Sequence, residues 1–579
     1  MFPLPSLACL ACCASLGAGR DVKTFVNPAV PIDVPIPGNY TGDLRPQVHY
    51  SPPQGFMNDP NGMFVDANGT WHLYYQYNPT AVVAGNQHWG HATSQDLYHW
   101  INQPIALFPP EERVYVFSGS CVVDVNNTSG FFPNQTNGVV AIFTLARYFE
   151  NGSAGPQTQA IAYSHDGGFS FQYFKGNPVI DSTSTQFRDP KVIWFEDHWA
   201  MVIAYAQEFT VGVFTSPDLK SWSHASNFSY HGLLGAQYEC PNLVKMPVRD
   251  RVGGDVVDEA FVMALSVQPG APLGGSTTQY FPGSFNGTHF SPWDSATRLT
   301  DFAKDNYAAQ YFFGVTEGSN AINLGWASNW QYTQAVPTGT EGWRSAMTLP
   351  RANYLTKATR IGWIMVNEIV DPSPVLEDVP LQLSSWEIGS NSSLTPPSPL
   401  LIDYSMVDSN ALYIDVNVTS INASAITGSS TLNLTFSSPA SGESLRSGFY
   451  FGGDTPFFVD RGGTRAFDNI LFTDKFSVAD VWNTTAGTWR FQAVIDRSIY
   501  EVFIDSGIHA GTITFFSTQP LTVLSINTTA LPKGTEVFVA VWPLKSAWKP
   551  FENEQGIVAG NTSALHRKGK RYMEYDPQF

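Results

Sequence analysis

One carboxylate in this sequence lies in a turn that proline and glycine hold in place. Asp59 follows Asn58 and precedes Pro60, Asn61 and Gly62. Proline restricts the residue before it to extended geometry and glycine permits a positive φ, so the local sequence constrains where this carboxylate points. A carboxylate held in place suits nucleophilic catalysis through a covalent intermediate. Taken alone, the same residues would also fit an ordinary surface turn.

Two other carboxylates, Asp189 and Glu239, could act together with Asp59. Asp189 lies in Phe-Arg-Asp-Pro at 187–190, and Glu239 lies in Gln-Tyr-Glu-Cys-Pro at 237–241. Taken singly, the first is typical of a turn and the second of a partly buried ion-pair partner. Retaining glycosidases, however, need two carboxyl groups about 5 Å apart, one to attack the anomeric carbon and one to protonate the leaving oxygen.

The neighbours of these carboxylates differ in a way that suits such a pair. The amides of Asn58 and Asn61 are expected to keep Asp59 ionised. The apolar residues at 238–241 are expected to surround Glu239 and keep it protonated. An ionised nucleophile beside a protonated acid is the combination on which glycosidase chemistry depends.

Composition narrows the class of protein. The chain has 579 residues, more than a single hydrophobic core usually holds, so we expect two domains, or a repeat architecture and a second domain. The 43% of hydrophobic residues, 14% of aromatic residues, 48 glycines and 40 prolines favour strands and turns, so we predict an all-β protein. A net charge of −18 argues against a nucleic-acid partner and fits a neutral one such as a sugar.

Several features predict a secreted, extracellular glycoprotein. Residues 1–18 are apolar and end in small residues, as a signal peptide does, and no later run is long enough to span a membrane. About fifteen Asn-x-Ser/Thr sites could carry glycans. Three of the five cysteines lie in the signal, which leaves Cys121 and Cys240 either paired or free. The sequence leaves open whether the chain forms homo-oligomers.

A recurring pattern divides the chain. Small or polar turn residues followed by an aromatic recur at 93–100, 164–171, 215–222 and 284–290. The spacing of roughly 50 to 70 residues is typical of propeller blades, although an irregular sandwich remains an alternative. With a last unit at 325–330, we predict a five-bladed β-propeller over 45–375. Around it we expect an N-terminal leader (19–44), a Ser- and Pro-rich linker (376–404), a C-terminal β-sandwich (405–548) and a basic tail (549–579).

The motifs, taken in order, resemble the invertase and fructanase family of glycoside hydrolases, over residues from about 49 to 545. They are Met-Asn-Asp-Pro-Asn-Gly at 57–62, Gln-Tyr-Asn-Pro at 76–79, Trp-Gly-His at 89–91, Phe-Ser-Gly-Ser at 117–120, Arg-Asp-Pro at 188–190, Glu-Cys at 239–240, Gly-Trp-Ala-Ser-Asn-Trp at 325–330 and Gly-Trp-Arg-Ser at 342–345. The resemblance implies a five-bladed propeller with the site in its funnel, followed by a lectin-like sandwich. It also implies a retaining β-fructofuranosidase that needs no metal or organic cofactor.

The resemblance assigns roles by motif position. It makes Asp59 the nucleophile, Glu239 the acid/base and Asp189 the carboxylate that holds fructose hydroxyls. It places Asp301 and Lys304 at the edge of the pocket. The residues that it places in the fructose pocket are Asn58, Gln76, Phe117, Ser118, Arg188 and Trp330.

Three positions depart from the family pattern. Phe56 and Ala84 stand where a Trp is usual, and Ala303 replaces a usual Gly. The absence of an indole at position 84 widens the pocket. It therefore remains open whether water or a second sugar is the main acceptor of the fructosyl group. The alternatives are therefore a sucrose hydrolase with transfructosylation, a fructosyltransferase, and an exo-inulinase or levanase. A carbohydrate-binding protein without activity is disfavoured, because all three carboxylates remain.

Overall fold

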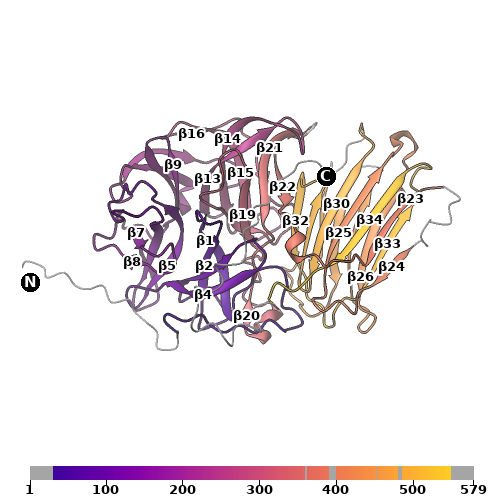
Figure 1. Cartoon of the computed structure of the whole chain (residues 1–579), viewed down its shortest axis with the longest axis horizontal. Coiled ribbons are helices and arrows are strands. Elements are labelled where there is room, and N and C mark those ends of the chain that lie inside the picture. Colours follow the sequence, from indigo (N-terminus) through magenta and orange to yellow (C-terminus); the bar gives the residue numbers. More distant parts are fainter. Residues whose placement is uncertain are drawn as a thin grey trace, which may run out of the picture.

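The computed structural model describes residues 30–358, 361–389, 399–452, 454, 456–479 and 485–548. The predicted signal peptide and basic tail lie outside these residues. Strands make up nearly all of the regular structure, as predicted for an all-β protein, and two bodies lie side by side (Figure 1). The helices in this part of the chain are short 3-10 turns at Ala206–Glu208, Pro337–Glu341, Ser373–Val375 and Ala423–Ala425. None of the described helices is long and apolar enough to cross a membrane.

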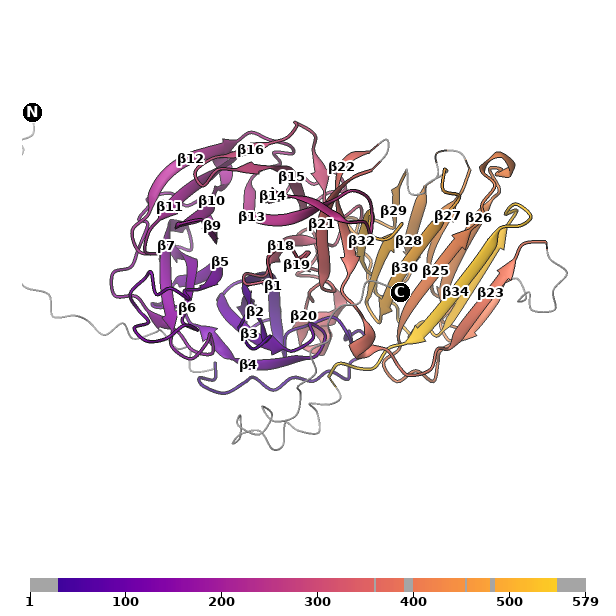
Figure 2. The same ribbon diagram turned by 45° about the horizontal axis from the view of Figure 1, so that its top comes forward.

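Antiparallel sheets surround a common centre in the N-terminal body, and their innermost strands face it (Figure 2). The first blade contains β1 (Gly55–Val65), β2 (Trp71–Asn78), β3 (His88–Ser94) and β4 (Trp100–Leu107). The second contains β5 (Val114–Val123), β6 (Val139–Tyr148), β7 (Ala154–Ser164) and β8 (Gln172–Tyr173). The third contains β9 (Phe187–Phe195), β10 (His198–Tyr205), β11 (Thr210–Ser216) and β12 (Ser223–Ser229).

The last two blades share one nine-stranded sheet, in which a single parallel pair, Val248 with Leu355, joins them. The fourth contains β13 (Tyr238–Arg249), β14 (Val256–Val267), β15 (Thr277–Phe285), β16 (Phe290–Pro292) and the short β17 (Arg298–Leu299). The fifth contains β18 (Tyr307–Tyr311), β19 (Ala321–Trp326), β21 (Arg351–Ala358) and β22 (Gly362–Ile369). Then β20 (Trp343–Arg344) pairs with β1 and closes the ring, which gives the predicted five-bladed propeller.

The recurring turn found in the sequence joins the third and outermost strands of a blade. In the first blade Asp96 accepts hydrogen bonds from the backbone N–H of Tyr98 and of His99, at 2.9 and 2.8 Å. In the third blade Asp218 accepts from the N–H of Lys220 and of Ser221, at 2.9 and 2.7 Å. A side-chain oxygen that caps its own turn, from Asp in the first three blades and from Asn286 in the fourth, is the reason why this pattern repeats in those four blades.

The C-terminal body is a β-sandwich of two six-stranded sheets. One contains β23 (Gln382–Glu387), β25 (Ala411–Thr419), β30 (Trp489–Asp496), β31 (Ile499–Ile504), β32 (His509–Thr514) and β34 (Glu536–Pro543). The other contains β24 (Leu400–Asp403), β26 (Thr431–Ser437), β27 (Ser444–Tyr450), β28 (Phe457–Gly463), β29 (Lys475–Val478) and β33 (Val523–Thr529). Side chains of both inner faces, among them Leu434, Phe449, Phe491 and Val539, form one buried core.

Two expected connecting segments belong to the fold. The stretch 376–404, expected as a linker, supplies β23 and β24, the edge strands of the two sheets. In β23 exposed residues alternate with half-buried ones, as in an edge strand that packs on one side. The sequence did not reveal this strand, because the many Ser and Pro residues that follow it are typical of a linker. In the expected leader, Tyr40 is buried and stacks on Trp548 at 3.9 Å between ring centroids.

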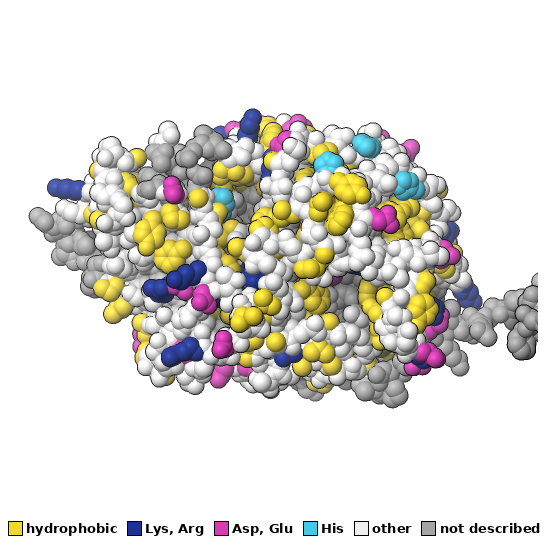
Figure 3. Space-filling model, turned by 180° about the vertical axis from the view of Figure 1, so that it is seen from behind, with side chains coloured by type: hydrophobic (Ala, Val, Ile, Leu, Met, Phe, Trp, Pro, Cys, Tyr) yellow, Lys and Arg dark blue, Asp and Glu magenta, His cyan; other side chains and the backbone are white. Residues whose placement is uncertain are grey.

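The surface agrees with the low proportion of charged residues. On the face shown in Figure 3, Lys and Arg side chains are separated from one another and lie among Asp and Glu. Such a surface offers no extended basic strip on that face for a phosphate backbone.

Candidate active site

The three predicted carboxylates lie near the start of three innermost strands. Asp59 lies in β1, Asp189 in β9 and Glu239 in β13. The strand pairing is irregular at each carboxylate. The irregularity lies between Met57 and Pro60 for Asp59 and between Glu239 and Asn242 for Glu239, and for Asp189 it lies opposite the Val202–Ala204 stretch of the partner strand β10. A proline follows each carboxylate within two residues, and since proline cannot donate to the ladder, it favours a bulge there. The three carboxylates at these bulges form one cluster, in which Cys240 contacts Asp59 and Asp189 and Arg188 contacts Glu239.

Three side chains donate to the Asp59 carboxylate. They are Asn58 through Nδ2 at 3.1 Å, Ser118 through Oγ at 2.8 Å, and Cys240 through Sγ at 3.4 Å. Asn61, which we expected to donate to Asp59 as well, instead donates to the carbonyl of Pro60 at 3.2 Å and accepts from the backbone N–H of Gln76 at 3.0 Å.

The pKa of Asp59 is raised rather than lowered, which corrects the expectation from the sequence. Burial is the largest cause and the neighbouring charge of Glu239 the next, while the hydrogen bonds from Ser118, Asn58 and Cys240 oppose them. The three hydrogen-bond donors therefore reduce the upward shift of the Asp59 pKa, which burial and the negative charge of Glu239 cause.

Polar groups, not apolar ones, surround the Glu239 carboxylate. Arg188 donates through Nη2 to Oε1 at 2.8 Å, Gln237 donates to the same oxygen at 2.9 Å, and the Tyr307 hydroxyl donates to Oε2. The expected apolar setting was wrong, because successive side chains of a strand point to opposite faces. Tyr238 accordingly packs into the core between the third and fourth blades.

Asp189 connects the other two carboxylates. Its backbone is in the left-handed region, with φ of 67°, and its N–H donates to the Thr144 hydroxyl at 3.1 Å. Its Oδ2 accepts from the backbone N–H of Cys240 at 2.9 Å and lies 3.6 Å from the Cys240 thiol. Burial raises the pKa of Asp189, Arg188 opposes this, and the charges of Glu239 and Asp59 add to it.

The other predicted pocket residues lie around this cluster. Gln76 lies opposite the bulge that holds Asn58 and Asp59, and donates to the carbonyl of Val116 at 3.1 Å. Phe117 precedes Ser118 on β5. The Trp330 ring lies 6.1 Å from the Phe56 ring and 4.8 Å from that of Trp326. Ala84 packs against the same aromatic group. Trp330 thus supplies an indole beside the fully buried Phe56.

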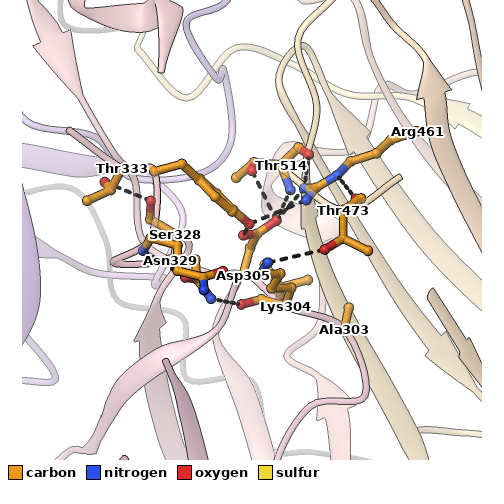
Figure 4. Close-up of polar contacts among 12 residues, drawn as sticks. Ala303, Lys304, Asp305, Ser328, Asn329, Thr333, Arg461, Thr473 and Thr514 are labelled. Atoms are coloured by element: carbon orange, nitrogen blue, oxygen red, sulfur yellow. Dashed lines mark hydrogen bonds and ion pairs between the residues drawn. The ribbon is translucent and has the colours of Figure 1, made fainter. Parts of the chain in front are cut away.

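Asp301 and Lys304, which the resemblance placed at the edge of the pocket, direct their side chains to the sandwich. Both are buried against the sandwich. Asp301 accepts from the N–H and the hydroxyl of Thr512, at 3.0 and 2.9 Å. Lys304 donates through Nζ to the carbonyl of Leu471 at 2.7 Å and to the hydroxyl of Thr473 at 3.2 Å (Figure 4). Sandwich groups that are distant in sequence therefore bind both side chains.

Some residues of the site were missed. Tyr307 and Gln237 contact Glu239, and Thr144 fixes the backbone of Asp189. One signal could have identified Tyr307. It begins the innermost strand of the fifth blade, the place where three other blades carry the predicted carboxylates.

The two cysteines of the described residues, Cys121 and Cys240, are free and buried. This settles the alternative that the sequence left open. In the described part of the chain, no group of three or more His, Cys, Asp and Glu side chains could hold a metal ion.

Comparison with known proteins identifies the family. The model of the glycosyl hydrolases family 32 N-terminal domain matches residues 49–361. An invertase of Kluyveromyces lactis is 37% identical over 545 residues, covering 82% of this chain and 87% of the relative. The chain belongs to glycosyl hydrolase family 32. It is a β-fructofuranosidase, as the resemblance implied. An extracellular exo-inulinase of Meyerozyma guilliermondii is 41% identical over 507 residues, covering 84% and 93%.

Solved structures of similar enzymes share the fold. The fructofuranosidase of Schwanniomyces occidentalis complexed with fructose gives a TM-score of 0.77 at 34% identity, covering 88% of this chain and 99% of that one. An exo-inulinase of Aspergillus awamori gives a TM-score of 0.77 at 30% identity, covering 88% and 100%. Invertases and exo-inulinases are thus similar to this chain to a comparable degree.

Proposed function

We propose that the protein hydrolyses terminal, non-reducing β-D-fructofuranosides such as sucrose, with retention of configuration. Asp59 attacks the anomeric carbon of the fructosyl unit while Glu239 protonates the departing glycosidic oxygen. Glu239, now a base, then takes a proton from water as the water attacks the fructosyl-Asp59 ester and releases fructose. One observation carries this proposal. Asp59, Asp189 and Glu239 come from three blades and form one buried cluster, linked through Cys240 and Arg188.

The remaining residues of the cluster bind the sugar in this proposal. Asp189 is an acceptor for fructose hydroxyls, and Arg188 holds both Asp189 and Glu239, at 4.0 and 2.8 Å. Asn58 and Ser118 orient the nucleophile. Gln76, Phe117 and Trp330 complete the pocket for the fructosyl unit. At high sucrose a second sugar replaces water as the acceptor, because Ala84 leaves room on that side.

We also infer that the protein acts outside the cell. The apolar N-terminus and the many Asn-x-Ser/Thr sites support this inference, and so does the name of the Meyerozyma guilliermondii relative, an extracellular exo-inulinase.

The test is the turnover of sucrose by Asp59→Ala and Glu239→Ala, with Asp197→Ala as control. Each of the first two variants should lose roughly three orders of magnitude or more in kcat, since members of a catalytic unit fail together. Asp197, whose side chain is 91% exposed, should be dispensable. Azide should partly restore Glu239→Ala on a substrate with an activated leaving group, because the fructosyl-enzyme still forms and lacks only its base.

Two results would contradict the assignment. One is full turnover in either catalytic variant. The other is a product whose anomeric configuration, followed by NMR before mutarotation, is opposite to that of the substrate.

A further inference from the structure

Two glutamines of the second blade bind the segment of the third blade that carries Arg188 and Asp189. Gln157 and Gln159 lie two residues apart on β7, so their side chains project from the same face of that strand. They are 5% and 0% exposed. A buried amide is costly unless its donor and its acceptor find partners, so those partners show what the two side chains hold in place.

Gln159 belongs to a closed ring of hydrogen bonds that begins and ends on this segment. The backbone N–H of Asp189 donates to the Thr144 hydroxyl at 3.1 Å, and that hydroxyl donates to Oε1 of Gln159 at 2.8 Å. Nε2 of Gln159 then donates to the carbonyl of Phe187 at 2.9 Å. The ring therefore holds the backbone on both sides of Arg188.

Gln157 holds the same backbone and also the Arg188 side chain. Its Oε1 accepts from the backbone N–H of Phe187 at 2.9 Å and from Nη1 of Arg188 at 3.3 Å. Nη1 also donates to Oε1 of Gln186 at 2.7 Å, while Nη2 donates to Glu239 at 2.8 Å. Gln157 thereby helps to set the direction from which the guanidinium reaches the acid/base.

The conformation of Asp189 needs such support. Its φ of 67° lies in the left-handed region, which a residue with a Cβ adopts only where its surroundings hold it. The fourth blade holds the carboxylate, because Oδ2 accepts from the backbone N–H of Cys240 at 2.9 Å. The second blade holds the backbone through Thr144. Loss of the ring would free this backbone to relax, and the carboxylate would move with it.

The hydrogen-bonding directions require an amide at position 159. The Thr144 hydroxyl has one proton to donate and needs an acceptor, whereas the carbonyl of Phe187 needs a donor. Glutamine offers both on one side chain. A carboxylate at this position would have no proton for Phe187, and an apolar side chain would leave both partners buried and unsatisfied.

We propose that Gln157 and Gln159 are positioning residues for the reaction. They hold Asp189 where it meets the hydroxyl groups of the fructosyl unit, and Arg188 where it meets Glu239. The inference deepens the proposed function and rests on it, because it needs a fructosyl unit in contact with Asp189. A displacement of about 1 Å in such groups can cost about a hundredfold in rate, even when the substituted residue lies far from the reacting atoms.

Gln159→Met tests the ring, because methionine has a similar length but cannot donate a hydrogen bond and accepts only weakly. The inhibition constant of fructose should rise about tenfold, the change expected when a hydrogen bond to a charged group is misaligned. The value of kcat for sucrose should fall by at least the same factor. The inhibition constant does not depend on how much of the enzyme is folded, so a purely structural role would leave it unchanged.

Gln47→Met is the matched control for the loss of a buried amide. Gln47 is 5% exposed, donates to the carbonyl of Tyr40 at 2.9 Å and accepts from the Ser546 hydroxyl at 2.8 Å. Its replacement should lower stability and leave the fructose constant at the wild-type value.

Two variants of Thr144 keep the test independent of how well Gln159→Met folds. Thr144→Val removes the hydroxyl at nearly constant volume and should raise the fructose constant as Gln159→Met does. Thr144→Ser keeps the hydroxyl and should retain the wild-type constant.

Gln157→Met tests the contact with Arg188. The leaving oxygen of sucrose needs the proton of Glu239, whereas p-nitrophenolate can leave without one. The ratio of kcat/KM for sucrose to that for p-nitrophenyl β-D-fructofuranoside should therefore fall about fivefold. A smaller folded fraction would lower both values equally and would keep the ratio.

The outcomes separate this inference from the proposed function. In a wild type that hydrolyses sucrose and is inhibited by fructose, an unchanged fructose constant in Gln159→Met and Thr144→Val overturns the role of Gln159. An unchanged substrate ratio in Gln157→Met overturns the role of Gln157, and an equal effect of Gln47→Met overturns both roles. In each case the proposed function stands. A wild type that neither hydrolyses sucrose nor binds fructose overturns the proposed function and the inference together.

Discussion

Arg461 in the sandwich donates through Nη1 to Oδ2 of Asp305 in the propeller at 2.8 Å, and both side chains are fully buried (Figure 4). The same carboxylate oxygen accepts from the N–H and the hydroxyl of Thr514, at 2.9 and 3.0 Å. The guanidinium lies 3.4 Å from the centroid of the Phe472 ring. This buried ion pair is well satisfied, and it joins the two domains.

The pair also holds two segments that lead to the active site. Asp305 is two residues before Tyr307, which donates to Glu239. The other oxygen of Asp305 accepts from the hydroxyl of Tyr332, two residues after Trp330. The sandwich therefore fixes the position of both the acid/base side and the aromatic wall of the pocket.

Replacing Arg461 by Met should lower the free energy of unfolding by about 3 to 5 kcal/mol, because Asp305 then remains buried and uncompensated. Denaturant unfolding measures this change. Arg446→Met is a matched control from the same sheet. The Arg446 side chain is 54% exposed, so the loss of its pair with Asp460 should cost about 1 kcal/mol or less. Equal losses in the two variants would show that the interdomain pair has no special role.

Ser118→Ala should move the acid limb of kcat/KM to higher pH. Asp59 must be ionised to attack, so activity falls as the pH drops through its pKa, which burial and Glu239 already raise. The Ser118 hydroxyl opposes that shift by donating to Oδ2 at 2.8 Å. Its removal should raise the pKa of Asp59 further.

The pH profile of the free enzyme on sucrose measures this effect. Ser120→Ala is the control, because Ser120 is buried on the same strand but donates to the carbonyl of Pro190. An acid limb at the same pH in wild type and Ser118→Ala would rule out this hydroxyl as a determinant of the Asp59 pKa.

A second buried charge cluster connects the start of the propeller to the sandwich. His49 lies 2.8 Å from Asp496 and 3.5 Å from Glu501, and all three side chains are fully buried. Burial by itself would lower the pKa of His49, but its interactions with the carboxylates of Asp496 and Glu501 outweigh burial and raise it to about 9. The pKa values of Asp496 and Glu501 are lowered despite burial, by His49 in the first case and by Arg351 and His49 in the second.

Stability should therefore be greatest in mildly acidic conditions. The contribution of His49 is fully present below the ordinary histidine pKa of 6.5 and is lost as the pH rises toward about 9. The contribution of the two carboxylates is present above about pH 4 and is lost at lower pH. His49→Gln should abolish most of the alkaline loss in Tm, whereas His224→Gln, at an exposed position, should keep it. Parallel Tm profiles for wild type and His49→Gln would contradict this account.

The sequence predicted those parts of the site that depend on local geometry. Asp59, Asp189 and Glu239 each precede a proline that forces a bulge, and a bulge is a local property of a strand. The first four blades were predictable for a similar reason, because each carries its own capped turn, whereas the fifth does not, since residues 325–330 lie at the end of β19. The polar setting of Glu239 could also have been predicted in part, since alternation along a strand sends Tyr238 away from its carboxylate.

Long-range packing decided the rest. Lys304 fits the pattern of a pocket residue, but Leu471 and Thr473 bind it, and they lie more than 160 residues further along the chain. Tyr307 reaches Glu239 because the fourth and fifth blades pack together. Contacts between residues so far apart depend on how complete domains dock, which no local pattern contains.

The acceptor preference should depend on Ala84, which packs beside Phe56 and Trp330 on the open side of the pocket. Once the fructosyl-Asp59 intermediate forms, water at about 55 M competes with sucrose at about 2 M, so about 2 kcal/mol of preferential contact lets a sugar compete equally. We expect fructo-oligosaccharides at high sucrose and hydrolysis at low sucrose, with a shift toward hydrolysis in Ala84→Trp, whose indole fills that space.

Val83→Trp is the control, because Val83 is 38% exposed and the substitution adds the same ring one residue away. The measurement is the ratio of glucose to free fructose across sucrose concentrations. If the wild type gives a ratio of about one even near saturating sucrose, water is the sole acceptor. If the wild type gives a higher ratio and Ala84→Trp gives the same ratio as the wild type, position 84 does not cause the transfer to sugar.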